Sequence, residues 1–135
     1  MTHMLASRLQ NLSLLLALAW MATLFYLSHQ PSLATPSLFE HQDKLFHAGA
    51  YGLLGFLLAG ALFDPARPLR TLLVVWLLGS LYGMSDEFHQ FFIPGRHADP
   101  LDVLADSVGA LLGGLAGIFL WGRVLRKSPG RDCTT

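Results

Sequence analysis

Residues 9–27 form a largely apolar run that contains no charged residue. As a helix, this run would reach about 28 Å, which is close to the thickness of the hydrocarbon core of a bilayer. A cleaved signal peptide is the alternative, because Arg8 supplies a positive flank and residues 32–34 loosely resemble a cleavage site. The run is longer than the roughly 7–15 apolar residues of a typical signal peptide. We therefore interpret it as a membrane-spanning helix.

Three further apolar runs follow the first. The second ends at residues 64–68, a sequence rich in proline that breaks helices. The third, residues 71–85, is short, but Leu69 and the stem of Arg70 can extend it. The sequence thus predicts an all-α, polytopic four-transmembrane-helix bundle that forms a single domain over residues 1–135, with spans at about 9–27, 45–63, 69–85 and 103–122.

The composition agrees with a membrane protein. Hydrophobic residues make up 53% of the chain and charged residues only 13%, whereas soluble domains carry about 25% charge. The net charge is zero, which gives no reason to expect a nucleic-acid partner. The sequence contains no zinc-ligand spacing, P-loop or dinucleotide fingerprint, so we expect no metal and no cofactor. The single cysteine, Cys133, cannot form a disulfide within the chain.

The basic residues predict the orientation of the spans. Seven of them flank one side of the membrane if there are four spans: Arg8, Arg67, Arg70, Arg123, Arg126, Lys127 and Arg131. Only Lys44 and Arg96 lie on the other side. The positive-inside rule therefore predicts that both termini are cytoplasmic and that the outer segments are about residues 28–43 and 86–101.

Polar side chains concentrate near the outer ends of the last three spans. Helical periodicity places Lys44, His47 and Tyr51 on one face of the second span. Asp102 and Asp106 stack on one face of the fourth span. An ionised group in the centre of a bilayer costs roughly 2.5–3.5 kcal/mol, so such groups should face the bundle interior or a wet cavity. Asp43, Tyr82, Asp86, Glu87, His89, Gln90, Arg96 and Asp99 complete the predicted polar pocket.

Two ridges of small residues predict how the helices pack. Gly52 and Gly55 belong to the ridge of the second span, and Gly109, Gly113 and Gly117 belong to that of the fourth. Small residues let helix backbones approach closely within lipid. We therefore expect these two helices to touch, although the same ridges would also suit a homodimer.

Three motifs resemble those of the VanZ-like membrane proteins. They are residues 43–47 with 51–55, residues 86–96, and Asp99 and Asp102 continuing through 106–109 to Gly113. The resemblance extends over about residues 9–122. It implies a multi-pass protein of the bacterial inner or plasma membrane and an association with teicoplanin resistance. It does not imply an established reaction.

Our preferred hypothesis is an envelope protein whose outer pocket binds an anionic headgroup. The ligand would be a membrane lipid or a lipid-linked cell-wall component. Lys44 and Arg96 would contact its phosphate or carboxylate, because arginine can bind such groups with two parallel hydrogen bonds. Tyr51 and Gln90 would contribute further contacts. Asp43, Asp86, Asp99 and Asp106 would form the surrounding polar cluster.

Two other classes of function stay open at this point. An intramembrane hydrolase or transferase would use Glu87 or Asp102 as a general base and His47 or His89 as its acid–base partner. His and carboxylate side chains are suitable metal ligands, but their spacing in the sequence matches no standard metal motif. In the second class, the polar cluster would be an ion-pair network that locks a small bundle, and a homodimer would be compatible with this role.

Overall fold

The computed structural model describes residues 2–31 and 38–126, which contain four long helices. These are α1 (Thr2–Ser28), α2 (Gln42–Leu62), α3 (Pro68–Gln90) and α4 (Pro100–Arg126). Each helix is long and apolar enough to cross a membrane. The structure thus confirms the predicted all-α fold with four candidate membrane spans.

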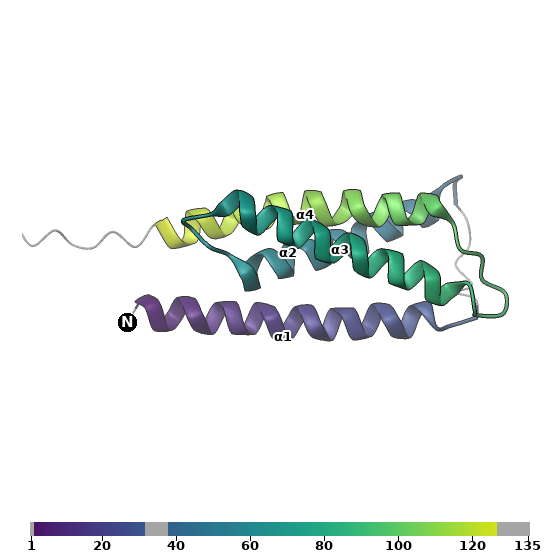
Figure 1. The fold of residues 1–135 in the computed structure, drawn as a ribbon, viewed down its shortest axis with the longest axis horizontal. Coiled ribbons are helices and arrows are strands. Elements are labelled where there is room, and N and C mark those ends of the chain that lie inside the picture. The colour runs from purple at the N-terminus through teal and green to yellow at the C-terminus, as the bar shows by residue number, and fades with distance from the viewer. Residues whose placement is uncertain (1, 32–37, 127–135) are drawn as a thin grey trace, which may run out of the picture.

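The four helices lie side by side along one axis, with consecutive helices running in opposite directions (Figure 1). The first residues of α1 and the last residues of α4 therefore lie at the same end of the bundle. The opposite end carries the loop at residues 91–99 and the described residues between α1 and α2, which are 29–31 and 38–41. We call this opposite end the polar end.

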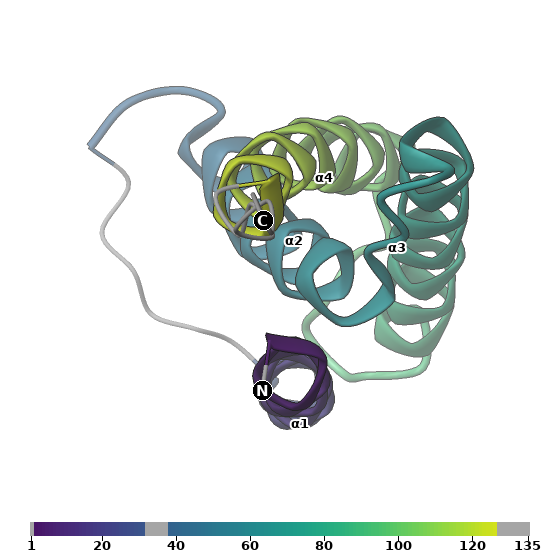
Figure 2. The ribbon, with the colours of Figure 1, turned by 90° about the vertical axis from the view of Figure 1, so that its left-hand side faces the viewer.

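The second helix occupies the middle of the bundle, in contact with each of the other three (Figure 2). Its closest neighbour is α4, because glycines let the two backbones meet. A methyl group at Gly113 would overlap the backbone carbonyl of Gly52, and one at Gly109 would overlap that of Ala48. The predicted contact between the two small-residue ridges is thus confirmed, and it uses both ridges within one chain.

The first helix is attached to the bundle partly through hydrogen bonds to backbone carbonyls. Trp20 Nε1 donates to the carbonyl of Ala50 at 2.9 Å. Tyr82 Oη donates to the carbonyl of Met21 at 2.7 Å. Such hydrogen bonds matter within a bilayer, because apolar side chains gain little free energy by exchanging lipid contacts for protein contacts. The buried apolar core at this helix consists of Ala17 and Leu24, which pack in one cluster with Tyr51, Leu54, Leu58, Ala59 and Val75.

We predict that Gly113→Ala destabilises the protein by about 1–3 kcal/mol, because the added methyl group must push α2 and α4 apart. Gly49→Ala is the matched control, since a methyl group there meets nothing within 4 Å. It should leave stability unchanged or raise it slightly, because alanine favours helix. Unfolding in mixed micelles, followed by circular dichroism, measures both. Equal stability of the two variants would contradict the close packing.

Candidate functional site

Lys44, in the first turn of α2, is the centre of an ion-pair cluster at the polar end. Its Nζ lies 2.9 Å from Asp43 Oδ2, 2.6 Å from Asp99 Oδ2 and 2.6 Å from Asp102 Oδ1. The Lys44 and Asp102 side chains are 18% and 9% exposed, so this pair is largely shielded from solvent. The positive charge of Lys44 is therefore already matched by carboxylates of this chain.

Asp99 connects this cluster to the loop and to α4. Its backbone N–H donates to Glu87 Oε2 at 3.0 Å, and its Oδ1 accepts from the N–H of Leu101 at 2.9 Å. The bond from Leu101 makes Asp99, the residue before Pro100, the N-cap of α4. The hydrogen bond from Lys44 lowers the pKa of Asp99. Its ionised form therefore stabilises the fold above the ordinary aspartate pKa of about 3.9, and this contribution is lost as pH falls through the lowered pKa.

A second cluster lies deeper, where α2, α3 and α4 meet. His47 Nδ1 is 2.9 Å from Asp106 Oδ1, and His47 Nε2 is 3.8 Å from Asp102 Oδ2. Asp106 is completely buried and Glu87 is 5% exposed. His47, Glu87 and Asp106 each offer one potential metal-ligand atom within 4.8 Å of the others. The sequence placed all three side chains in one polar pocket, but because they come from different helices, their spacing in the sequence matched no metal motif.

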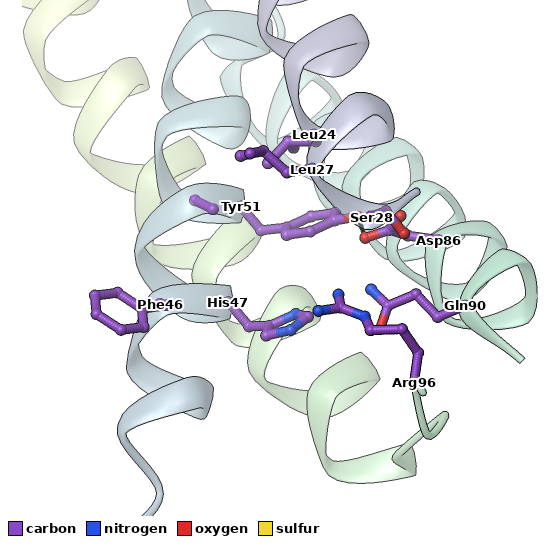
Figure 3. Close-up of a pocket in the computed structure, with 10 residues that line it drawn as sticks. Leu24, Leu27, Ser28, Phe46, His47, Tyr51, Asp86, Gln90 and Arg96 are labelled. Carbon is purple, nitrogen blue, oxygen red and sulfur yellow. Dashed lines mark hydrogen bonds between the residues drawn. The ribbon is translucent and has the colours of Figure 1, made fainter. Parts of the chain in front are cut away.

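A cleft of about 120 Å³ opens beside these clusters. Tyr51 crosses it and donates from Oη to Asp86 Oδ2 at 3.3 Å. Figure 3 shows Arg96 reaching from the loop toward His47 and Gln90. Arg96 is half-buried, and its guanidinium forms no hydrogen bond or ion pair with any residue that the structure describes. The rest of the lining is Leu24, Leu27, Ser28, Phe46 and Ala50.

The turn before Arg96 explains how its side chain reaches the cleft. Gly95 has a φ of 82°, which glycine adopts without strain. A side chain there would also come within 3.2 Å of the carbonyl oxygen of Pro31. The Pro94–Gly95 sequence thus folds the loop against the end of α1 and directs the chain back over the bundle.

The structure does not bring all candidate residues together. His89 turns toward α1, where its Nε2 is 3.1 Å from His29 Nδ1 and its ring lies 4.9 Å from that of Phe25. It lines a separate cavity with Phe25 and Phe92. Conversely, Leu24, Leu27 and Ser28 line the cleft without having been predicted to do so. Helical periodicity describes one helix at a time and cannot reveal that α1 closes the cleft.

The helices and their polar clusters define a small multi-pass membrane protein with a buried, mostly acidic site at one end. Residues 12–121 match the VanZ/LLP1 family. The chain therefore belongs to the VanZ/LLP1 family, as the sequence motifs predicted. No curated protein and no solved structure matches the chain.

We predict that Lys44→Met destabilises the protein by about 2 kcal/mol. This is less than the roughly 3–5 kcal/mol of a fully buried pair, because Lys44 keeps some exposure. Lys44→Arg, which keeps the positive charge, should lower the stability much less than Lys44→Met. Adding Asp102→Asn to Lys44→Met should recover part of the loss, since it removes the carboxylate left most buried. Unfolding in mixed micelles provides the measurement, and wild-type stability in Lys44→Met would contradict the role of this pair.

Proposed function

We propose that this VanZ/LLP1-family protein binds an anionic headgroup in the cleft at its polar end, on the outer side of the cell membrane. The ligand would be a membrane lipid or a lipid-linked cell-wall component. The observation that carries the proposal is the Arg96 guanidinium, which lines the cleft and pairs with none of the described carboxylates. A phosphate or carboxylate is the natural partner for its planar, paired donors.

The lining of the cleft supports a lipid ligand. Its polar groups, including His47, Gln90 and Arg96, lie together, whereas Leu24 and Leu27 lie farther along the bundle (Figure 3). This gradient suits a molecule with a charged head and an apolar tail. The volume of about 120 Å³ is well below the roughly 300–1,000 Å³ of pockets for drug-sized ligands. The cleft therefore suits a headgroup rather than a whole glycopeptide.

Arg96, rather than Lys44, supplies the positive charge in this proposal. Lys44 was an equal candidate from the sequence, but three carboxylates surround it at 2.6–2.9 Å. An anion would have to displace one of them. Asp86, which also lines the cleft, would favour a headgroup that carries a hydroxyl or amine next to its anionic group.

The proposed orientation places both termini in the cytoplasm. The bundle supports it because the basic residues Arg8, Arg67 and Arg123 share the end opposite the polar end. Basic residues of this kind favour the cytoplasmic side. The cleft would then face the outer leaflet, where lipid-linked cell-wall components are used.

The single cysteine gives a direct test of this orientation. In spheroplasts, we predict that Cys133 reacts with a membrane-impermeant maleimide only after permeabilisation. A Cys133→Ser, His97→Cys variant should react without permeabilisation, because exposed His97 lies in the loop at the polar end. The reverse labelling pattern would place the cleft in the cytoplasm and exclude an outer-leaflet ligand.

Headgroup binding is tested by native mass spectrometry of protein purified in mild detergent. Wild type should retain a headgroup-bearing lipid. Arg96→Ala should retain at least about tenfold less of it, because hydrogen bonds to charged groups contribute roughly 1.5–3 kcal/mol. Arg96→Lys should be intermediate. Arg67→Ala, at the opposite end, is the charge-matched control. Equal retention in Arg96→Ala and Arg67→Ala, with both folded, would contradict the proposal.

A hydrolase or transferase acting on the same headgroup is the second candidate. The observation that favours it is His47, which lines the cleft while its Nδ1 contacts buried Asp106. A carboxylate that orients a histidine in this way is a common element of acid–base sites. The same spectra distinguish the two candidates, because turnover would release a cleaved headgroup and binding alone would leave the adduct intact. Any link to teicoplanin resistance is tested by drug susceptibility of cells that carry wild type or Arg96→Ala.

A further inference from the structure

We propose that His47, Glu87 and Asp106 form a binding site for a divalent transition cation of the zinc or manganese type. The site lies between α2, α3 and α4, next to the cleft but without Arg96. This proposal does not depend on headgroup binding, because the three ligands do not include Arg96, the residue on which headgroup binding rests.

The donor set and its spacing suit such an ion. Imidazole nitrogen favours zinc, iron and related metals, and carboxylate oxygen also accepts manganese. Three protein ligands with a remaining open position are typical of reactive zinc sites. Ligands bound at about 2.1 Å can lie at most about 4.2 Å apart. The present spacing, within 4.8 Å, would therefore need only a small contraction around the ion.

Two of the ligand residues carry buried oxygen atoms with no hydrogen-bond partner. These atoms are Glu87 Oε1 and Asp106 Oδ2. The other oxygen of each residue has a partner, because Glu87 Oε2 accepts from the N–H of Asp99 and Asp106 Oδ1 lies 2.9 Å from His47 Nδ1. An ion bound at His47 Nδ1 would take the place of the contact between His47 and Asp106 Oδ1. Buried polar atoms without partners are rare, since each costs the desolvation of that group. A cation is the partner that two neighbouring carboxylates would share.

Charge around the cluster leads to the same conclusion. Among the described residues, Lys44 is the only lysine or arginine with an ion pair at the polar end, and it is matched by Asp43, Asp99 and Asp102. Arg96 reaches toward His47 from the cleft but forms no ion pair with Glu87 or Asp106. Of the described basic side chains, His47 is the one grouped with these two carboxylates, and it can carry at most one positive charge. A divalent ion would balance both carboxylates. The competing arrangement is a proton held by the cluster, with no ion bound.

The surroundings resemble the outer shell of known metal sites. Metal-bound histidines usually direct their second nitrogen toward a carboxylate or carbonyl. His47 Nε2 faces Asp102 Oδ2 at 3.8 Å, and Asp102 is fixed in turn by Lys44. Gly83, one turn before Glu87, leaves room for the Asp106 carboxylate, because a methyl group there would approach Asp106 Oδ2 to 2.8 Å. His47 also lines the cleft, which gives an ion a route into the cluster.

The test is equilibrium dialysis of chelator-treated, full-length protein against zinc, manganese or magnesium alone, with bound metal measured by mass spectrometry. We expect folded wild type to bind a single zinc or manganese ion per chain. Glu87→Gln and Asp106→Asn should lose it. Asp102→Asn should bind about 10–100-fold more weakly, as expected for a residue that orients a ligand. Asp43→Asn removes one charge at the same end outside the cluster and should bind like wild type.

Several results would overturn the site. Absence of bound zinc and manganese in folded wild type would assign the cluster to a shared proton, whatever the variants do. Unchanged binding in Glu87→Gln and Asp106→Asn would place the ion elsewhere, and binding of magnesium alone would exclude a transition cation. Zinc or manganese should also raise the unfolding temperature of wild type and Asp43→Asn. An unchanged unfolding temperature of wild type in the presence of zinc or manganese would count equally against the site, because a ligand that binds the folded state stabilises that state. Arg96→Ala should keep the ion, which separates this test from that of headgroup binding.

Discussion

The close contact between the backbones of α2 and α4 positions the charged groups that these two helices carry at the polar end. Water does not drive helices together inside lipid, so the contact depends on the absence of side chains at Gly52, Gly109 and Gly113. Because the two helices are in register along this seam, Lys44 meets Asp102 and His47 meets Asp106. A shift of a few tenths of an ångström between the helices would change these distances directly. Rigidity of the seam is therefore a condition for the site and not only for stability.

Charge at the polar end is unevenly distributed with depth. The part nearer the end of the bundle holds Lys44, which is surrounded by three carboxylates, so its charge is more than balanced. The deeper part holds Glu87 and Asp106, which are grouped with His47 and form no ion pair with Arg96. Electrostatic interactions strengthen as the local dielectric falls, so the deeper pair has the larger unmet demand for positive charge. This difference in depth is the reason to assign a cation to His47, Glu87 and Asp106 and not to the acids around Lys44.

The sequence predicted features that depend on one helix or one type of residue. Apolar runs predicted four candidate spans, and the small-residue ridges predicted the contact of α2 with α4. Helical spacing correctly put Asp102 and Asp106 on one face. The sequence placed His47 and Glu87 in one polar pocket, but it could not show atomic contacts between helices, such as the close approach of His47, Glu87 and Asp106 or the turning of His89 toward His29. It also could not show that Lys44 is paired and Arg96 is not, because that depends on where the loop at residues 91–99 folds.

Different helices contribute different properties to the cleft. Apart from Ser28, the charged and hydrogen-bonding groups come from α2, α3 and the loop after α3. Asp99 links this loop to Glu87 of α3. The first helix adds mainly an apolar wall, Leu24 and Leu27, and is joined to the others by bonds to backbone carbonyls. Changes at these two leucines would therefore alter the shape of the cleft without altering its charge. In the proposed function, α1 would thus determine how the apolar part of a ligand fits, and Arg96 would determine which anionic group is held.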